Sequence, residues 1–261
     1  MHFTYFLLQM PPFVLMTACM LLFGLCGGVG AYLFRKYAKI QYLGSHNEVV
    51  GYVFGILGGF YALLMGFVVF FVWDALNQAQ NNANQEGSLA RGLYRDIRYH
   101  PDTAKIRPLL NCYLTYVHSV IDREYPDMER LKDFTVDDRR DFNNVFKEME
   151  KLDRHDLRVE QMFKHLNDLA NYRSLRILDG SSDIPIEIWV PLIIGAFIIL
   201  LFGAFLNVES LRLHLVVNAL LGAFIGMVIF LIIIINHPFS GRLRIKPEGY
   251  NTILQMANAG M

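Results

Sequence analysis

The side chains that could act on ions lie along one stretch, residues 58 to 80, GGFYALLMGFVVFFVWDALNQAQ. On a helical wheel, one face of this stretch carries bulky apolar residues that lie within about 40° of Phe60: Phe60, Leu64, Phe67 and Phe71. The same face continues past the apolar part with a carboxylate and two amides: Asp74, Gln78 and Asn82. Such a face could line a pore, with an apolar constriction that gates by dewetting and a wet vestibule beyond it. The alternative is that the aromatic rings face lipid or neighbouring helices.

The opposite face of this stretch is almost bare. Its small residues cluster near −140° on the wheel, roughly opposite Phe60: Gly51, Gly55, Gly59, Ala62 and Gly66. The spacing of four recurs in two other apolar runs, with the pairs Gly24 and Gly28, and Gly222 and Gly226. Small residues four apart let helix backbones approach closely in lipid. The pattern predicts a compact bundle that packs through these glycines.

Other reactive side chains form no catalytic or metal-binding pattern. Ser240 has no arrangement of His and Asp around it that would make it a nucleophile. His155, Asp156 and His165 lack the further ligands of a metal-dependent phosphohydrolase. The sequence contains no phosphate-binding loop, dinucleotide fingerprint or basic nucleic-acid patch. We therefore predict no enzyme activity, no cofactor, no metal and no nucleic-acid partner.

Polar residues at the ends of the apolar runs are interpreted structurally. His46, Asn47 and Glu48 precede the second run, where capping and interfacial hydrogen bonding are favoured over a metal or proton-relay role. Asn218 lies inside the last run, one turn from His214, and we favour a hydrogen bond between helices over ion coordination. The last run ends in a motif interpreted as a turn against the bundle: His237, Pro238 and Phe239.

Four runs contain no charged residue and span 19 to 24 residues each: Phe13 to Phe34, Val49 to Val72, Ile188 to Leu206, and Leu213 to Ile235. About 20 helical residues cross a bilayer core. We predict four transmembrane helices, at 13–34, 49–73, 187–206 and 213–236. The first is not expected to be a signal peptide, because no Lys or Arg precedes it and the run is too long.

The charges concentrate between the second and third runs. Residues 74–186 hold 17 Lys and Arg and 20 Asp and Glu, so we predict a water-exposed insert there, between a hairpin at 1–73 and a hairpin at 187–236. Apolar residues recur at helical spacing in it, as at Ile106, Leu109 and Tyr113. Thr135 and Asp138 resemble a capping box. A short tail, 237–261, comes after the last span.

Four stretches resemble the bacterial bestrophin-like membrane protein family, distant relatives of the bestrophin anion channels. They are HNEVVGYVFGILGGFYALLMGFVVFFVWD at 46–74, NANQEGSLARGLYR at 82–95, IPIEIW at 184–189 and HPFSG at 237–241. The resemblance implies a pentamer of four-span subunits in the bacterial inner membrane, with cytoplasmic termini and a cytoplasmic helical insert. The positive charges near the spans do not settle this orientation themselves.

The resemblance also implies that the second span carries an aromatic neck. Gly59 to Tyr61 and Gly66 with Phe67 both resemble the Gly-Phe element of a bestrophin neck, so the register between Phe60 and Phe67 stays open. No acidic run in the short tail matches the bestrophin calcium clasp.

The fold class expected is therefore an all-α integral membrane protein with a helical insert between spans two and three. The expected function is a homo-oligomeric channel that conducts small inorganic ions passively. It would select chloride or other anions if the kinship with bestrophins extends to function. The alternative is a non-conducting membrane-anchored scaffold or signalling protein whose insert binds a partner.

Overall fold

A computed structural model describes residues 2–38, 45–132 and 140–259 of the chain. The backbone of these residues is largely helical, and they contain no strand. The predicted capping box of Thr135 and Asp138 lies outside the described residues. The chain divides into two compact units, which are described separately below.

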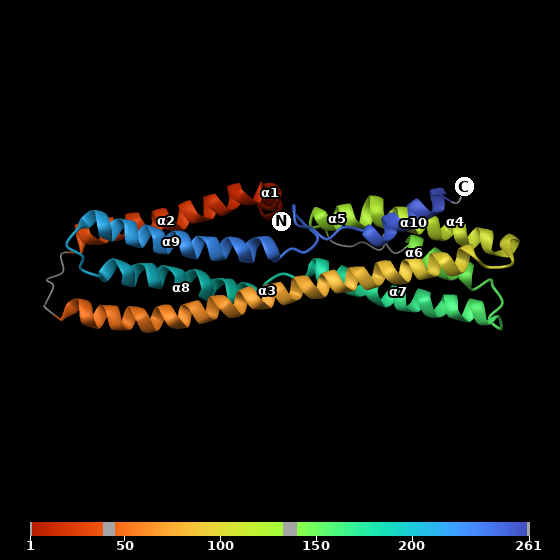
Figure 1. The fold of residues 1–261 in the computed structure, drawn as a ribbon, viewed down its shortest axis with the longest axis horizontal. Helices are drawn as coiled ribbons and strands as arrows, with labels where there is room; N and C mark the ends of the chain where they lie inside the picture. Colours follow the sequence, from red (N-terminus) through yellow and green to blue (C-terminus); the bar gives the residue numbers. More distant parts are fainter. Residues whose placement is uncertain (1, 39–44, 133–139, 260–261) are drawn as a thin grey trace. The chain divides into compact units, whose positions relative to one another are not determined.

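The helices, in chain order, are shown in Figure 1: α1 His2–Gln9, α2 Pro12–Tyr37, α3 His46–Arg98, α4 Thr103–Ser119, a π-helical turn Val120–Glu124, α5 Tyr125–Glu129, α6 Arg140–Met149, α7 Leu157–Ser181, α8 Ile186–Phe205, α9 Leu211–Ile235 and α10 Glu248–Ala259. Several starts have local causes. Asp102 and Asp156 accept backbone N–H bonds at the beginnings of α4 and α7, and Ser210 does so for α9. A proline begins α2.

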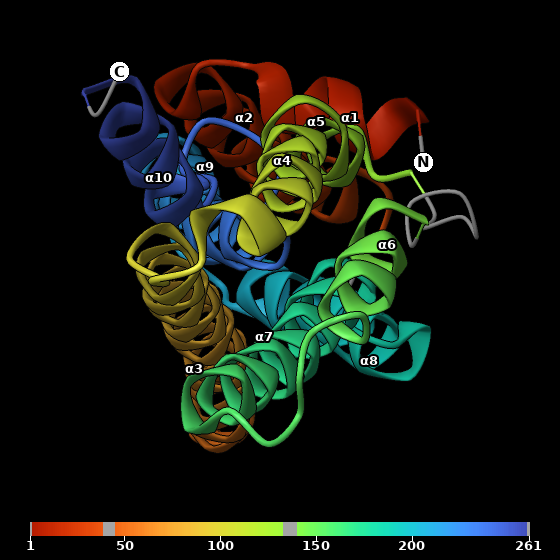
Figure 2. The ribbon, with the colours of Figure 1, turned by 90° about the vertical axis from the view of Figure 1, so that its right-hand side faces the viewer.

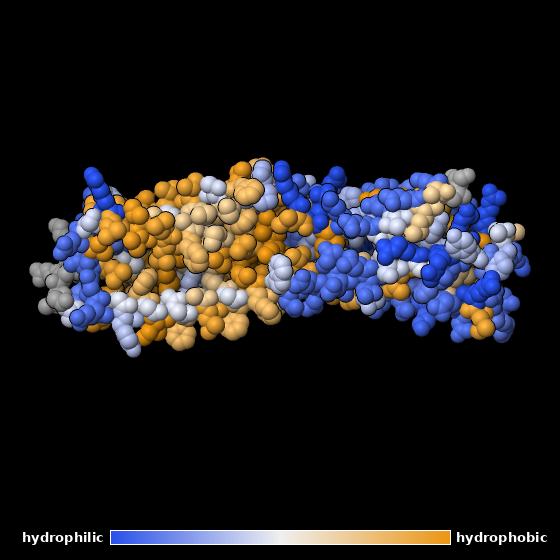
Figure 3. Space-filling view, in the orientation of Figure 1, coloured by the Kyte–Doolittle hydropathy of each residue, from blue (hydrophilic) through white to orange (hydrophobic). Residues whose placement is uncertain are grey.

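The membrane unit comprises Phe6–Asp74 and Asp183–Asn236. Its four principal helices, α2, the first part of α3, α8 and α9, are long and apolar enough to cross a bilayer. Apolar side chains dominate the surface over these helices (Figure 3). The four predicted spans and the all-α class are confirmed. The predicted second span ends at 73, but its helix continues without interruption to Arg98.

Close packing of α2 on α9 depends on glycine. A Cβ atom on Gly222 would collide with the backbone carbonyl of Phe23, and one on Gly226 would collide with that of Cys19. On α2, a Cβ on Gly24 would lie 3.2 Å from the carbonyl oxygen of Ala219. Because these positions carry no side chain, the two backbones approach closely, and van der Waals packing stabilises the pair in lipid.

The polar unit comprises Met1–Tyr5, Ala75–Ser182 and His237–Met261. Helices α4, α5, α6, α7 and α10, with the second part of α3, surround one apolar core (Figure 2). Residues of α3 in this core recur at helical spacing: Ala79, Ala83, Ala90, Leu93 and Ile97. The insert and the tail therefore fold together, because α10 contributes Tyr250 and Ile253 to the same core.

Candidate pore helix and buried charge network

The apolar face of α3 points away from the other helices of the membrane unit. Phe60 is 68% exposed, Phe67 64% and Phe71 57%, and Leu64 is also exposed. The buried residues of the same helix segment are Met65, Val68 and Val72, which join the core with α8 and α9. The fold therefore leaves the predicted constriction residues on an outer face, outside the unit's own core.

The polar residues that continue this face are in different surroundings. Asp74 and Gln78 are exposed. Asn82 is half-buried, and its Nδ2 donates a hydrogen bond to Oδ2 of Asp179 in α7, at 2.8 Å. The amide of Asn82 thus fixes α3 against α7 in the polar unit, whereas Asp74 and Gln78 keep their place on the outer face.

The bare face of α3 meets nothing in the described part of the chain. A Cβ atom on Gly51, Gly55, Gly59 or Gly66 would meet no atom within 4 Å apart from the neighbouring backbone of its own helix. Two of these glycines line an apolar groove of about 570 Å³, whose other wall includes Phe224 of α9. Packing through this face stays a prediction, and it would require a second chain or lipid.

The residues at the start of α3 bind the connection between α8 and α9. Nε2 of His46 lies 3.0 Å from the carbonyl oxygen of Phe205. Asn47 forms a reciprocal pair with the backbone of Asn207: its Nδ2 donates to the carbonyl at 2.7 Å, and its Oδ1 accepts from the N–H at 2.8 Å. Glu48 is exposed in the first turn. These contacts fasten the start of α3 to the end of α8 and to Asn207, within the membrane unit.

Polar groups inside the membrane unit converge on one carbonyl. His214 and Asn218 of α9 are each 2% exposed. Nε2 of His214 lies 3.1 Å from the carbonyl oxygen of Gly203 in α8, and Nδ2 of Asn218 donates to the same oxygen at 3.3 Å. Asn218 thus makes a hydrogen bond between helices, the role that the sequence favoured.

The motif at 237–241 is part of the polar unit, where its side chains pack on α5. The ring of Phe239 is buried and meets the ring of Tyr125 edge to face, with 6.0 Å between centroids. Pro238 accepts a backbone hydrogen bond from Ile245. Ser240 donates from Oγ to the carbonyl of Glu129 at 2.7 Å, which gives the hydroxyl a structural role. His237 follows Asn236, the C-cap of α9, and its carbonyl accepts a hydrogen bond from the N–H of Ser240.

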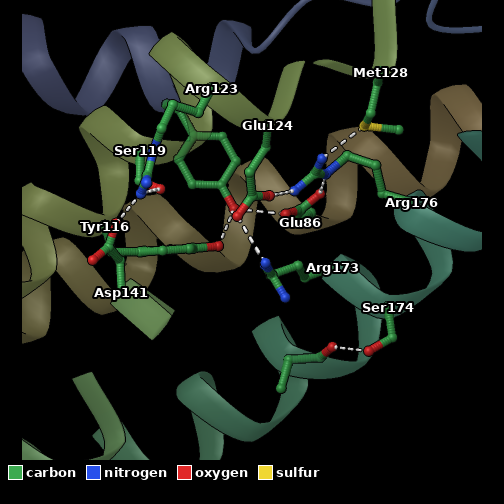
Figure 4. Close-up of polar contacts among 12 residues, drawn as sticks. Glu86, Tyr116, Ser119, Arg123, Glu124, Met128, Asp141, Arg173, Ser174 and Arg176 are labelled. Carbon is green, nitrogen blue, oxygen red and sulfur yellow. Dashed lines mark hydrogen bonds and ion pairs between the residues drawn. The ribbon is translucent and has the colours of Figure 1, made fainter. Parts of the chain in front are cut away.

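A charge network that the sequence-based predictions missed is buried in the polar unit (Figure 4). Arg176 of α7 is fully buried, and its Nε donates to Oε2 of Glu86 in α3 at 2.6 Å. A second nitrogen of the same guanidinium donates to Glu124, and a third to the sulfur of Met128 at 3.0 Å. The guanidinium also stacks over the ring of Tyr125, at 4.8 Å from its centroid.

Arg173 and two tyrosines complete the network. Arg173 donates to Oε1 of Glu124 at 2.7 Å. Tyr250 of α10 donates its only hydroxyl proton to Oε1 of Glu86 at 2.7 Å, so Tyr116, 3.0 Å away, must donate to the oxygen of Tyr250. Two arginines face two carboxylates, and the cluster is neutral. Complete pairing of this kind makes buried charges tolerable.

The surroundings keep these groups in fixed charge states. Burial alone would lower the pKa of Arg176, but attraction to Glu86 and Glu124 outweighs it and raises that pKa well above its ordinary value. Burial raises the pKa of Tyr116 and of Tyr250 well above the usual range, and the nearby carboxylates add to the effect. Both arginines stay charged and both hydroxyls stay protonated.

A π-helical turn positions one member of the network. Val120–Glu124 adopts π geometry between α4 and α5, closed by a bond from the N–H of Tyr125 to the carbonyl of Val120. A π turn inserts one extra residue into a helix and rotates the residues after it. Glu124, at the end of this turn, points at both arginines.

One sequence signal could have identified the network. The buried residues of α7 recur at helical spacing as Val159, Met162, Leu166 and Leu169, and the next two positions of that face are Arg173 and Arg176. Charged residues that continue an apolar face are expected to be buried and paired. The partner Glu86 lies 90 residues earlier, so spacing alone could not have identified it.

Fold and sequence comparisons agree on the class of protein. The chain is an α-helical membrane protein with four spans and a helical insert. The model of the bestrophin-like domain family matches residues 21–250, and the chain belongs to that family.

Solved structures with the same fold include variants of a bacterial bestrophin homolog from Klebsiella pneumoniae. One is 14% identical, with a TM-score of 0.72 over 93% of this chain and 96% of that one. Another is 15% identical, with a TM-score of 0.70 over 94% and 99%. A further structure, described as a membrane protein, is 16% identical, with a TM-score of 0.69 over 94% and 97%. No curated protein matches the chain.

Proposed function

We propose that the chain is one subunit of an oligomeric ion channel, with the first part of α3 lining a central pore. The observation that carries this proposal is the exposure of Phe60, Phe67 and Phe71 on one face of a helix whose buried side chains join the core of the membrane unit. Membership of the bestrophin-like family supports it. By resemblance, the oligomer is a pentamer in the bacterial inner membrane, with the insert and both termini cytoplasmic.

The exposed face of α3 points outward, so one chain alone cannot surround a pore with it. When several copies surround an axis, the exposed faces of α3 meet there and their phenyl rings form an apolar constriction. Such a constriction blocks ions by excluding water until it widens. The rings at Phe60 and Phe67 are equally suited to be narrowest, since both are more than half exposed.

Two arguments about the selectivity of this pore point in opposite directions. Asp74 continues the aromatic face and is exposed, and a ring of carboxylates favours cations. Anion selectivity rests on the resemblance to bestrophins. Reversal potentials in asymmetric potassium chloride decide between the two ions, and Asp74→Asn is expected to shift the reversal potential toward that of chloride.

The test of conduction is the purified full chain in planar bilayers. Discrete currents are expected, and Phe67→Ala and Phe71→Ala are expected to increase open probability or conductance because they widen the constriction. The matched control is Phe197→Ala, which removes an aromatic ring of similar exposure from α8. Silence of the wild type and of both α3 variants would contradict the channel proposal, as would equal effects of the three substitutions.

The second candidate is a membrane-anchored scaffold. It is favoured by the separate, fully formed core of the polar unit, which a simple anchor does not require. A scaffold predicts that Phe67→Ala and Phe71→Ala leave cellular function intact, while changes to the surface of the polar unit remove it. The two candidates therefore give opposite results for the same pair of variants.

A further inference from the structure

A pocket in the polar unit gathers arginines from the last part of α3. It has a volume of about 790 Å³, and its lining includes Arg91, Arg95 and Arg98, with no Asp or Glu among its lining residues. The three arginines succeed one another at spacings of four and three, so they share one side of the helix. The pocket therefore concentrates positive charge, and no acidic side chain lines it.

The helix itself does not account for this arrangement. Arg95 and Arg98 lie in the last turn of α3, where cations are favoured by the helix dipole. Arg91 lies a further turn back, outside that influence, and it repels Arg95 because like charges four apart destabilise a helix. Neither Arg91 nor Arg95 forms an ion pair with any acidic residue in the described part of the chain.

The wall opposite the arginines is held firmly in place. Gly249 of α10 crosses α3 at Gly87 so closely that a Cβ on either residue would strike the other backbone. Tyr250 then bonds to Glu86 inside the core. Because α10 is fixed at this end, its later residues Met256 and Ala259 line the pocket in a defined position. The site is therefore preformed.

The lining combines two kinds of chemistry. The guanidinium groups offer planar pairs of donors that match phosphate oxygens, and the hydroxyl of Ser88 adds another donor. Met256 and the buried side chain of Tyr94 supply an apolar surface. The volume suits a small organic molecule and is far larger than one halide ion needs.

We propose that this pocket binds a phosphate-bearing organic molecule, with the phosphate on Arg91 and Arg95 and the organic part against α10. The site is independent of ion conduction, since neither its residues nor its chemistry belongs to the proposed constriction. A bound ligand would join α3 to α10 and neutralise the repulsion between the arginines. The same phosphate chemistry could be presented by a soluble metabolite or by a lipid headgroup.

Calorimetric titration of the purified full chain in phosphatidylcholine nanodiscs at about 0.15 M salt, where the Debye length is about 8 Å, tests the proposal. The probes are inorganic pyrophosphate for the charge and phenyl phosphate for the combined site. Saturable binding of both is expected, and the double variant Arg91→Gln with Arg95→Gln is expected to lower the affinity at least about tenfold, through loss of charge-assisted hydrogen bonds. Absence of binding by the wild type up to about 1 mM would overturn it.

The matched control carries the same loss of charge elsewhere. Arg107→Gln with Arg158→Gln removes two exposed arginines of the polar unit that do not line the pocket. This control is expected to change the affinity less than about twofold, because exposed distant charges are screened. An equal loss of affinity in both double variants would reduce the binding to general electrostatic attraction and overturn the site.

A second variant guards against unfolding of the unit by the double substitution. Ser88→Glu introduces a carboxylate on the exposed side of α3, three residues before Arg91, where it forms a helix-compatible ion pair. It is expected to abolish pyrophosphate binding while the protein stays folded. Undiminished binding in this variant would contradict the assignment of the pocket.

The source of the phosphate is determined by a parallel titration with phosphatidic acid added to the nanodiscs. Competition that weakens the apparent pyrophosphate affinity in proportion to the added lipid assigns the site to headgroups. Unchanged affinity assigns it to soluble phosphates. Either result supports a phosphate site at Arg91 and Arg95, provided that the Ser88→Glu variant fails to bind.

Discussion

The two parts of α3 use the same helix in opposite ways. In the membrane unit, its phenylalanines from Phe60 to Phe71 are exposed, and a Cβ on its glycines would meet no other helix in the described part of the chain. In the polar unit, the same helix buries Ala79, Ala90 and Leu93 and places Glu86 in a fully paired charge network. The polar part of α3 is buried by its own chain, whereas the phenylalanine and glycine faces of its membrane part are not. The difference indicates that the polar part of α3 contributes to the core of its own unit, whereas one face of the membrane part stays open to lipid or to another chain.

The largest expected effect comes from alkaline pH, which destabilises the polar unit because its tyrosines are buried. The pKa values of Tyr113, Tyr116 and Tyr250 are raised by burial in the folded polar unit. Their stability contribution is complete below the unfolded pKa near 10 and is lost as pH rises above it, at about 1.4 kcal/mol per tyrosine per pH unit. We expect cooperative unfolding of the polar unit above pH 10.

Tyrosinate absorbance and circular dichroism, measured together, check this prediction. The buried tyrosines should titrate only as helix content falls. Gradual titration of every tyrosine near pH 10 with unchanged helix content would contradict it, because the hydroxyls would then be accessible in the folded state.

The next effect is the removal of one charge from the network. Arg176→Ala leaves Glu86 and Glu124 buried without their shared guanidinium and is expected to cost about 3–5 kcal/mol of folding free energy. Denaturant unfolding of the purified chain measures the loss. Arg158→Ala, at an exposed site of the same helix, is the control and should change stability by less than about 0.5 kcal/mol. Similar losses in both variants would mean that the buried ion pairs contribute no more to the folding free energy than an exposed arginine does.

A smaller effect is expected where α2 packs on α9. Gly222→Ala forces a methyl group against the backbone carbonyl of Phe23. The atoms that it meets belong to the backbone, so they cannot move aside as the end of a flexible side chain could. Overpacking of this kind costs about 1–3 kcal/mol. Thermal unfolding in detergent should show a lower midpoint than for the wild type. An unchanged midpoint would show that the two helices separate freely, and that the membrane unit is held together elsewhere.

Sequence-based prediction succeeded where a single helix carries its own signal. Charge-free runs identified four spans, because that signal depends only on local composition. The assignment of the two faces of α3 to a pore and to packing, made from phasing, stays a prediction. Sequence-based prediction missed Glu86 as the partner of Arg176, because the pairing depends on how distant segments fold together. It also could not tell whether Gly59 packs within the chain or between chains, since the same spacing of small residues serves both.

The smallest expected change in single-chain stability tests whether the bare glycine face of α3 contacts a second copy of the chain. Gly59→Ala meets open space in the chain and should stabilise α3 slightly, by roughly 0.5–1 kcal/mol, because alanine favours helix. If the bare face packs against a second copy, the added methyl group should instead weaken the oligomer. Native mass spectrometry in detergent measures the subunit number of the variant. Gly30→Ala, at an equally open position on α2, is the control. Loss of oligomer in Gly59→Ala alone would assign the bare face to contacts between subunits, and intact oligomers in both variants would leave that face to lipid.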